Sequence, residues 1–237
     1  MTHRFFVDAD VEDQVVVRGE QAHQIANVLR LVAGDQITLV RNGAESVVVL
    51  ETVDASAVRG RCVGKQTAGA EPRVQVTLAL PLLKGERSEE VIEAATQLGV
   101  STIVPFVSAR SVVRTLSNAK LERWTRIARE SAETARRGRV PSVEAIAEWP
   151  ALFERLTPPV IVPWEGEALK TLAETLTPPL PALSLVIGPE GGIGPDEIQL
   201  AWDKGATTVT LGPRNLRSET AAIAAVAQVI GILDRQR

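Results

Sequence analysis

The sequence has few of the residues that bind metals or form cross-links. Cys62 is the only cysteine among the 237 residues, which excludes an internal disulfide and a cysteine metal cluster. His3 and His23 are the only histidines, which argues against a histidine-rich metal site. We therefore expect a protein of a reducing compartment that has no metal centre.

Long apolar segments are also missing. The N-terminus reads Met-Thr-His-Arg-Phe-Phe and lacks the apolar core of a signal peptide. No apolar run reaches about 18 residues, the length that suits a membrane span. Apolar residues nevertheless make up 45% of the chain, enough for one large core or for a small and a medium domain. We expect a cytoplasmic protein with no membrane partner.

The second half of the chain contains three copies of one pattern, a short apolar run followed by a glycine-containing loop and a helical pattern. The strand exits at Trp164, Gly188 and Gly212 are 24 residues apart each time, as βα units require. If the strands are parallel, their loops emerge at one sheet edge, where open α/β sheets bind ligands. The predicted strands are Pro159–Trp164, Leu183–Ile187 and Thr207–Leu211, and the predicted helices begin at Ala168, Pro195 and about Glu219.

Two common nucleotide-binding fingerprints are absent from these loops. The dinucleotide pattern that starts at Gly192 and Gly194 needs a third glycine at the position of Glu197. A phosphate-binding P-loop that starts at Gly188 needs glycine and lysine where Ile193 and Gly194 stand. Glycines that let the main chain approach a flat ligand, such as an adenine ring, remain as one interpretation. Tight turns without a ligand are the alternative.

The two C-terminal loops carry a family resemblance. Ile187-Gly-Pro-Glu-Gly-Gly192 and Leu211-Gly-Pro-Arg-Asn-Leu-Arg-Ser-Glu-Thr-Ala221 resemble the paired signature of the ribosomal RNA small subunit methyltransferase E family. With weaker matches at Leu83-Lys-Gly-Glu-Arg87, Gln97-Leu-Gly-Val100 and Arg139-Val-Pro141, the resemblance covers nearly the whole chain. It implies a knotted, S-adenosylmethionine-dependent enzyme of the SPOUT superfamily that methylates N3 of a uridine in 16S rRNA of the small ribosomal subunit.

The resemblance also implies which residues hold the cofactor. S-adenosylmethionine is expected among the three loops, with its methyl group aimed at the acceptor base. Glu190 either hydrogen-bonds the cofactor or only fixes its own turn. The implied cofactor-binding residues are Pro163, Ile187, Gly188, Glu190, Gly192, Leu211, Gly212, Leu216 and Arg217.

Methyl transfer to uracil N3 requires a proton to leave, and Arg217 and Glu219 are the candidates for that chemistry. Both lie where the last glycine loop enters its helix. Arg217 is expected to orient the uracil or stabilise its anion, and Glu219 to accept the proton or to hold Arg217. In the alternative interpretation, Glu219 is a favourable first-turn acid and Arg217 is its salt-bridge partner.

The first 70 residues predict a separate β domain. Short strands dominate it, and Asn42-Gly43 suits a tight hairpin. The resemblance makes residues 1–70 a PUA-like RNA-binding barrel and residues 72–237 the methyltransferase domain. One helix is expected over Gln21–Arg30, where His23 and Arg30 are seven residues apart, hence on one face that can reach RNA; a structural histidine is the alternative. The expected strands are Val15–Arg18, Gln36–Arg41, Ser46–Val53 and Val58–Val63.

Basic residues are concentrated in the middle of the chain, although the net charge is −3. The segment from Arg110 to Arg139 contains nine arginines and lysines and three glutamates, whereas residues 140–205 contain three basic and ten acidic residues. A helix expected over Ala119–Arg136 has an apolar face and an arginine-rich face. A solvated surface is the simpler explanation, but the local excess favours phosphate binding, with Arg110, Arg136 and Arg137 as RNA contacts.

The expected fold class is α/β. General rules predict an ordinary doubly wound parallel sheet. The C-terminal trefoil knot of a SPOUT-type sheet, and a homodimer packed through the last helix, follow from the resemblance alone. Two other functions stay open: a related knotted enzyme acting on another RNA or on a ribose 2′-hydroxyl, and a non-catalytic RNA-binding protein.

Overall fold

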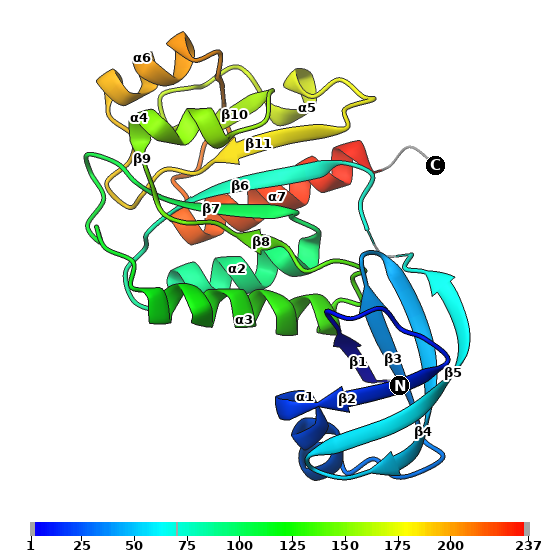
Figure 1. The fold of residues 1–237 in the computed structure, drawn as a ribbon. Helices are drawn as coiled ribbons and strands as arrows, with labels where there is room; N and C mark the ends of the chain where they lie inside the picture. Colours follow the sequence, from blue (N-terminus) through cyan, green and yellow to red (C-terminus); the bar gives the residue numbers. More distant parts are fainter. Residues whose placement is uncertain (1–2, 70, 235–237) are drawn as a thin grey trace. The chain divides into compact units, whose positions relative to one another are not determined.

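The protein is described by a computed structural model that covers residues 3–69 and 71–234, and the chain divides into two compact units (Figure 1). Unit 1 comprises Met1–Glu71 and Ala132–Val140, and unit 2 comprises Pro72–Ser131 and Pro141–Arg237. Residues 132–140, which the sequence placed in the second domain, thus belong to unit 1. The terminal residues of the two predicted domains, 1, 70 and 237, lie outside the described residues.

Unit 1 is built on a five-stranded sheet in the order β1-β3-β4-β5-β2. β1 runs parallel to β3, and the other neighbours are antiparallel. The predicted hairpin at Asn42-Gly43 is confirmed, since both residues have positive φ, 48° and 82°. The hydrophobic core of this unit includes Phe5, Ile25 and Ile37. The strands are β1 His3–Phe6, β2 Gln14–Arg18, β3 Gln36–Arg41, β4 Ala44–Val53 and β5 Ala57–Thr67.

The helix expected over Gln21–Arg30 is wrong in its bounds and in its type. α1 covers Gly19–His23, and a π-helix, η1, continues over Gln24–Val28. Its wider turn changes the angular spacing of side chains, and Arg30 lies beyond its end with φ of 54°. His23 and Arg30 therefore do not share one face of a regular α-helix. Both side chains are exposed.

Unit 2 contains a parallel sheet in the order β12-β10-β11-β6-β7-β8, with β9 also paired to β7. The prediction that the three loop-bearing strands run parallel is confirmed. They are β10 Val160–Pro163, β11 Ala182–Val186 and β12 Thr207–Val209; the others are β6 Gln75–Pro81, β7 Thr102–Val107, β8 Ser142–Val143 and β9 Ala147–Glu148.

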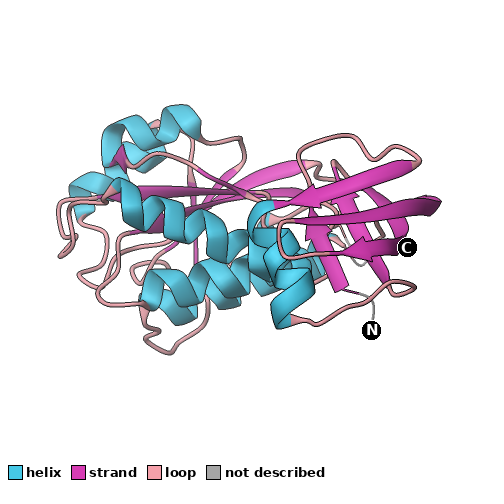
Figure 2. Ribbon diagram, turned by 60° about the horizontal axis from the view of Figure 1, so that its bottom comes forward, coloured by secondary structure: helices cyan, strands magenta, loops and turns pink. Residues whose placement is uncertain are grey.

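Helices cover both faces of this sheet (Figures 1 and 2). Trp149 and Phe153 pack with Ile198 and Ala201 in a core on the side of α4 and α6. α7 packs against α2 and β6 on the other side. The helices are α2 Arg87–Leu98, α3 Asn118–Thr134, α4 Trp149–Leu152, η2 Phe153–Arg155 (a 3₁₀-helix), α5 Leu172–Thr175, α6 Pro195–Asp203 and α7 Ser218–Leu233.

Local sequence explains where several helices end. Gly99 follows α2 with φ of 111°, and Gly205 follows α6 with φ of 82°, so the predicted stop at Gly205 is confirmed. The helix predicted from Ala168 is shorter than expected. Thr171 and Glu174 form a capping box that begins α5 at Leu172, and the preceding residues form a loop.

Candidate functional site

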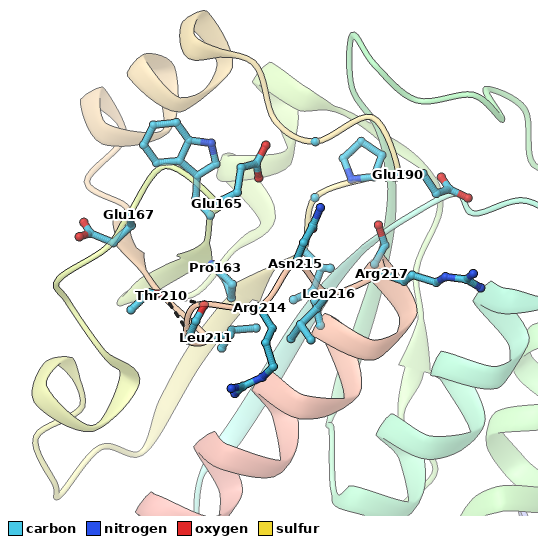
Figure 3. A pocket seen from close by; sticks show the side chains of 18 of the residues that line it. Pro163, Glu165, Glu167, Glu190, Thr210, Leu211, Arg214, Asn215, Leu216 and Arg217 are labelled. Carbon is cyan, nitrogen blue, oxygen red and sulfur yellow. Dashed lines mark hydrogen bonds between the residues drawn. The ribbon is translucent and has the colours of Figure 1, made fainter.

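A cavity of about 1050 Å³ lies in unit 2 where the loops after β10, β11 and β12 meet (Figure 3). β10 lies between β11 and β12 in the sheet, so three consecutive strands deliver their loops to one edge. All nine residues that the resemblance assigned to the cofactor line this cavity: Pro163, Ile187, Gly188, Glu190, Gly192, Leu211, Gly212, Leu216 and Arg217. The structure thus brings together the residues that the sequence grouped, although a cavity alone does not assign their roles.

The loop after β11 brings its main chain to the cavity. Gly192 has φ of 71°, a conformation that side-chain-bearing residues rarely adopt, and its N–H donates to Pro189 O at 2.8 Å. A Cβ added to Gly192 would lie 2.5 Å from Glu165 Oε1. The absence of a side chain at Gly192 therefore permits the tight turn and also the close approach of this loop to the loop after β10.

The loop after β10 is held by its own acidic residue. Glu167 Oε1 accepts hydrogen bonds from the backbone N–H groups of Leu169 and Lys170 at 2.9 and 3.2 Å, and Oε2 accepts one from Thr208 Oγ1. The bonds from Leu169 and Lys170 hold the pKa of Glu167 below its usual range. The ionised carboxylate of Glu167 therefore stabilises the conformation of this loop.

The end of β12 is hydrogen-bonded to the loop after β10. Trp164 N–H donates to Val209 O, and Thr210 N–H donates to Lys170 O, so residues 164–170 are fixed at both ends to one short stretch of chain. Gly212 then turns with φ of 105° toward α7. Figure 3 shows Arg214 directed away along α7, whereas Arg217 extends toward α2.

Four charged side chains gather at one end of the cavity, and we call Arg87, Glu190, Arg217 and Glu219 the charged end. Arg87 Nε lies 3.7 Å from Glu219 Oε1, and Arg87 Nη1 lies 3.7 Å from Glu190 Oε1. Arg217 Nη1 lies 4.0 Å from Glu219 Oε1. The predicted pairing of Arg217 with Glu219 is present, and Glu219 lies beside the cavity rather than among its lining residues.

Sequence reasoning did not identify Arg87 as a site residue. It is the first residue of α2 and lines the cavity more than 70 positions before the first glycine loop. The only signal was its place in the Leu83-Lys-Gly-Glu-Arg87 match, because no local pattern reports that α2 packs beside α7.

Glu190 has a structural partner in addition to Arg87. Its Oε1 accepts a hydrogen bond from the backbone N–H of Lys84 at 3.0 Å. The carboxylate therefore ties the loop after β11 to the segment that precedes α2. Of the two roles that the sequence left open for Glu190, the contacts observed are those of a loop anchor.

Arg110 packs on the loop after β11. Its Nη1 donates to Gly191 O at 3.3 Å, and a Cβ on Gly191 would lie 2.9 Å from Arg110 O. Next to it, Ala109 N–H donates to Glu197 Oε1 at 2.8 Å. The segment after β7 thus supports the cavity wall, a contact that the sequence did not indicate.

Arg137, predicted to contact RNA, is buried in unit 1. Its side chain is 2% exposed and is paired with Glu71 through two contacts, Nε to Oε1 at 3.2 Å and Nη2 to Oε2 at 2.8 Å. Glu71 Oε1 also accepts from the backbone N–H groups of Gly138 and Arg139. The assignment of Arg137 to RNA is therefore corrected, because its guanidinium is occupied inside the protein.

A second ion pair lies beside this one. Arg4 Nη2 lies 2.8 Å from Glu45 Oε1 and also donates to Arg137 O. Burial raises the pKa of Glu45, but hydrogen bonds from Arg4 and Gln66 and the charges of Arg4 and Arg136 outweigh burial and hold it below its usual value. We call Arg4, Glu45, Glu71 and Arg137 the clamp, because they fasten residues 132–140 to the rest of unit 1.

The other predicted RNA contacts, His23, Arg30 and Arg136, are exposed in unit 1. His23 Nδ1 lies 2.9 Å from Asn27 Nδ2, and Arg136 has φ of 56°. In the described part of the chain, no helix is long and apolar enough to cross a membrane. No cluster of three or more metal-ligating side chains occurs within the same residues.

Comparisons with known proteins match this chain over nearly its full length. A family model described as an RNA methyltransferase domain matches residues 70–230. The ribosomal RNA small subunit methyltransferase E of Bacillus subtilis is 34% identical over 90% of this chain and 88% of its own length.

Two solved structures share the fold. The ribosomal RNA small subunit methyltransferase E of Neisseria gonorrhoeae, bound to S-adenosylmethionine, has a TM-score of 0.89 at 26% identity over 98% of each chain. A methyltransferase from Legionella pneumophila, in complex with the same cofactor, has a TM-score of 0.88 at 27% identity over 98% of each chain.

Proposed function

The chain belongs to the ribosomal RNA small subunit methyltransferase E family, and on that premise we propose that it transfers a methyl group from S-adenosylmethionine to N3 of a uridine in 16S rRNA. The observation that carries the proposal is the cavity enclosed by three glycine-containing loops, with Arg87, Glu190 and Arg217 lining one end and Glu219 beside it. Relatives with the same fold bind this cofactor.

The cavity fits the cofactor in size and in chemistry. About 1050 Å³ is large enough for a nucleoside with an amino-acid tail. Gly192 lets its loop approach Glu165 more closely than a Cβ would allow, and Pro163, Leu211 and Leu216 offer apolar surface to an adenine ring. Ile187 N–H already donates to Ala79 O and Gly212 N–H to Thr210 Oγ1, so the contacts proposed for its polar edge come from the carbonyl groups of these residues and from the main chain of Gly188. We assign these residues to cofactor binding.

The charged end suits the acceptor base. The cofactor supplies a sulfonium methyl group that is already an activated electrophile. The protein must then orient uracil N3 and accept the proton that N3 loses as it forms its new bond to carbon. Glu219 is the proton acceptor in this proposal, and Arg217 stabilises the negative charge that develops on the base.

RNA is bound by exposed basic residues in each unit. Unit 1 acts as a PUA-like module, with His23, Arg30 and Arg136 as contacts, and its strand order with a covering helix is compatible with a small barrel. Arg110 contributes a charge in unit 2 next to the loop after β11. Each contact with a phosphate makes the affinity for RNA fall more steeply as the salt concentration rises. We propose that the substrate is 16S rRNA within the small ribosomal subunit, in the cytoplasm.

Knotting and dimerisation complete the proposal. We propose that the C-terminal segment is threaded to form a trefoil knot. The loop of residues 164–170, whose two ends are hydrogen-bonded to Val209 and Thr210, supports this proposal. In α7, Ala222, Ala225 and Val226 are buried within the chain, whereas Ile223 and Ile230 are half-buried and suit a homodimer contact. Sedimentation of the protein at micromolar concentration tests the dimer; a monomer contradicts it.

The function is tested by methyl transfer from labelled S-adenosylmethionine to small ribosomal subunits that lack their methyl marks. We expect one labelled nucleotide, which mass spectrometry identifies as uridine methylated at N3. A labelled methyl group on a ribose hydroxyl or on another RNA would contradict this proposal and would indicate the reaction of a related enzyme. No transfer together with no calorimetric binding of S-adenosylhomocysteine would instead indicate a non-catalytic RNA-binding protein.

A further inference from the structure

The loop after β10 carries two glutamates, Glu165 and Glu167, that differ in how their carboxylates are used. The Glu167 carboxylate accepts three hydrogen bonds, from Leu169 N–H, Lys170 N–H and Thr208 Oγ1. Among residues 3–69 and 71–234, by contrast, the Glu165 carboxylate has no hydrogen-bond or ion-pair partner. Glu165 lines the cavity and is exposed. One acid therefore holds the loop, and the other has both oxygens available to a ligand.

The main chain of Glu165 is fixed by a tight turn. Glu167 N–H donates to Trp164 O at 3.1 Å and closes a β-turn whose central residues are Glu165 and Gly166. A Cβ added to Gly166 would lie 2.3 Å from the Trp164 ring, so the turn packs closely on the indole. Trp164 in turn meets Trp202 edge-on, with ring centroids 6.0 Å apart. The carboxylate is thus presented by a preorganised segment, which lowers the cost of binding.

Glu165 lies in the part of the cavity proposed for the nucleoside. It follows Pro163, which offers apolar surface to adenine, by two residues, and a Cβ on Gly192 would lie 2.5 Å from its Oε1. Figure 3 shows Glu165 on the same side of the cavity as Pro163, with Glu190 and Arg217 on the opposite side. The sulfonium and the amino-acid tail share one sulfur atom, which must face the charged end. The ribose is therefore the part of the cofactor expected nearest Glu165.

The chemistry of a carboxylate matches that of a ribose. An ionised carboxylate only accepts hydrogen bonds, and its two oxygens can accept from two adjacent donors. The 2′- and 3′-hydroxyls of a ribose are two such donors, whereas an adenine edge mixes donors with acceptors. An acidic side chain hydrogen-bonds a ribose hydroxyl in the same way in dinucleotide-binding folds.

We propose that the Glu165 carboxylate binds the 2′- and 3′-hydroxyls of the cofactor ribose and thereby positions the methyl group toward the charged end. The inference rests on the proposed function and adds to it a binding residue that lies outside the glycine-loop motifs. Hydrogen bonds to a charged group are stronger than those between neutral groups, so this single side chain has a measurable effect on affinity.

The test is a calorimetric cycle between the carboxylate and the hydroxyls. S-adenosylhomocysteine and its 2′,3′-dideoxy analogue are each titrated into the unmodified protein and into Glu165→Ala. We expect the substitution to weaken binding of S-adenosylhomocysteine by about 10- to 100-fold. It should change the affinity for the dideoxy analogue by no more than about twofold, because the hydroxyls are already missing. Glu165→Gln keeps one acceptor oxygen and should retain part of the affinity.

Controls separate ribose binding from other effects of the substitution. Glu122→Ala removes an exposed glutamate of α3 that lies outside the residues lining the cavity, and it should leave both affinities unchanged. 5′-Methylthioadenosine keeps the ribose but lacks the amino-acid tail, so Glu165→Ala should weaken its binding by the same factor. Thermal unfolding of each variant checks that the fold is retained.

Three outcomes would overturn the inference. Equal losses for ribose and dideoxyribose ligands would mean that Glu165 acts on the loop or on the charge of the cavity. A loss for S-adenosylhomocysteine without one for 5′-methylthioadenosine would assign the carboxylate to the ammonium of the tail. No loss at all would leave it a solvated side chain. Failure of the proposed function differs, because the unmodified protein itself would then not bind S-adenosylhomocysteine or would not methylate uridine N3.

Discussion

The clamp of unit 1 and the charged end of unit 2 are each made of two arginines and two glutamates, yet they differ in how their charges are used. In the clamp, Arg137 is 2% exposed and hydrogen-bonded to Glu71, and Arg4 is in close contact with Glu45. At the charged end, Arg217 is 76% exposed and lies 4.0 Å from Glu219. Breaking a buried, hydrogen-bonded ion pair is costly to the fold, whereas open and loosely spaced pairs are available to a ligand.

The largest effect should follow from breaking the clamp. Arg137→Met leaves Glu71 without its charged partner, and removing one member of a buried pair costs about 3–5 kcal/mol of unfolding free energy. Chemical denaturation measures this loss, with exposed Arg155→Met as the matched control. If both variants unfold alike, the clamp is not a stabilising element. Cofactor binding by the folded variant should be unchanged, because the clamp contributes no residue to the cavity.

The opposite pattern is expected at the charged end. Arg217→Gln should lower kcat by about 100-fold, the range for loss of a group that stabilises developing charge, while stability stays within about 0.5 kcal/mol because the side chain is exposed. Single-turnover methylation and thermal unfolding measure the two quantities. A large fall in melting temperature with normal kcat would place Arg217 in the same class as Arg137.

A smaller effect should come from the main chain of the cavity. Gly192→Ala puts a side chain at φ of 71°, which costs about 1–2 kcal/mol and crowds Glu165. We expect calorimetric affinity for S-adenosylhomocysteine to fall about 10-fold. Gly64→Ala is the control, since an added methyl group there meets no atom within 4 Å. Equal affinities in the two variants would show that the Gly192 turn is not required for binding.

The smallest effect should be the acid sensitivity of the clamp. Because the folded pKa of Glu45 is held below its ordinary value of 4.5, its stabilisation is complete above that pH and is lost as the pH falls through the folded pKa. The gap in melting temperature between the natural protein and Glu45→Gln should thus be widest at neutral pH and narrow below about 4.5. A gap that is constant with pH would mean that the pair with Arg4 contributes no ionic stabilisation.

The sheet edge was predictable because its signal is local. Regular spacing of Trp164, Gly188 and Gly212 indicated three βα units, and parallel pairing then required their loops to meet. Eight of the nine residues assigned to the cofactor lie in the family motifs of those loops, and Pro163 ends the strand before the loop at Trp164. β1 was missed, since a four-residue strand pairing with β3 has no periodic signal of its own.

The parts that sequence reasoning did not find depend on contacts between distant segments. Arg137 is 66 residues from Glu71, so its arginine-rich surroundings predicted an exposed surface where the fold buries an ion pair. Arg87 reaches the cavity only because α2 packs beside α7. The π-helix after His23 also escaped, because α- and π-turns differ by a single residue in their hydrogen bonding.

The order in which the cavity walls occur along the chain has a consequence for biosynthesis. Apart from Arg87, every lining residue lies between Pro163 and Ala221. Unit 1 is complete once Val140 has been made. A nascent polypeptide therefore possesses its entire N-terminal module long before it can hold a methyl donor, and translation arrested in between yields a chain with no competence for transfer.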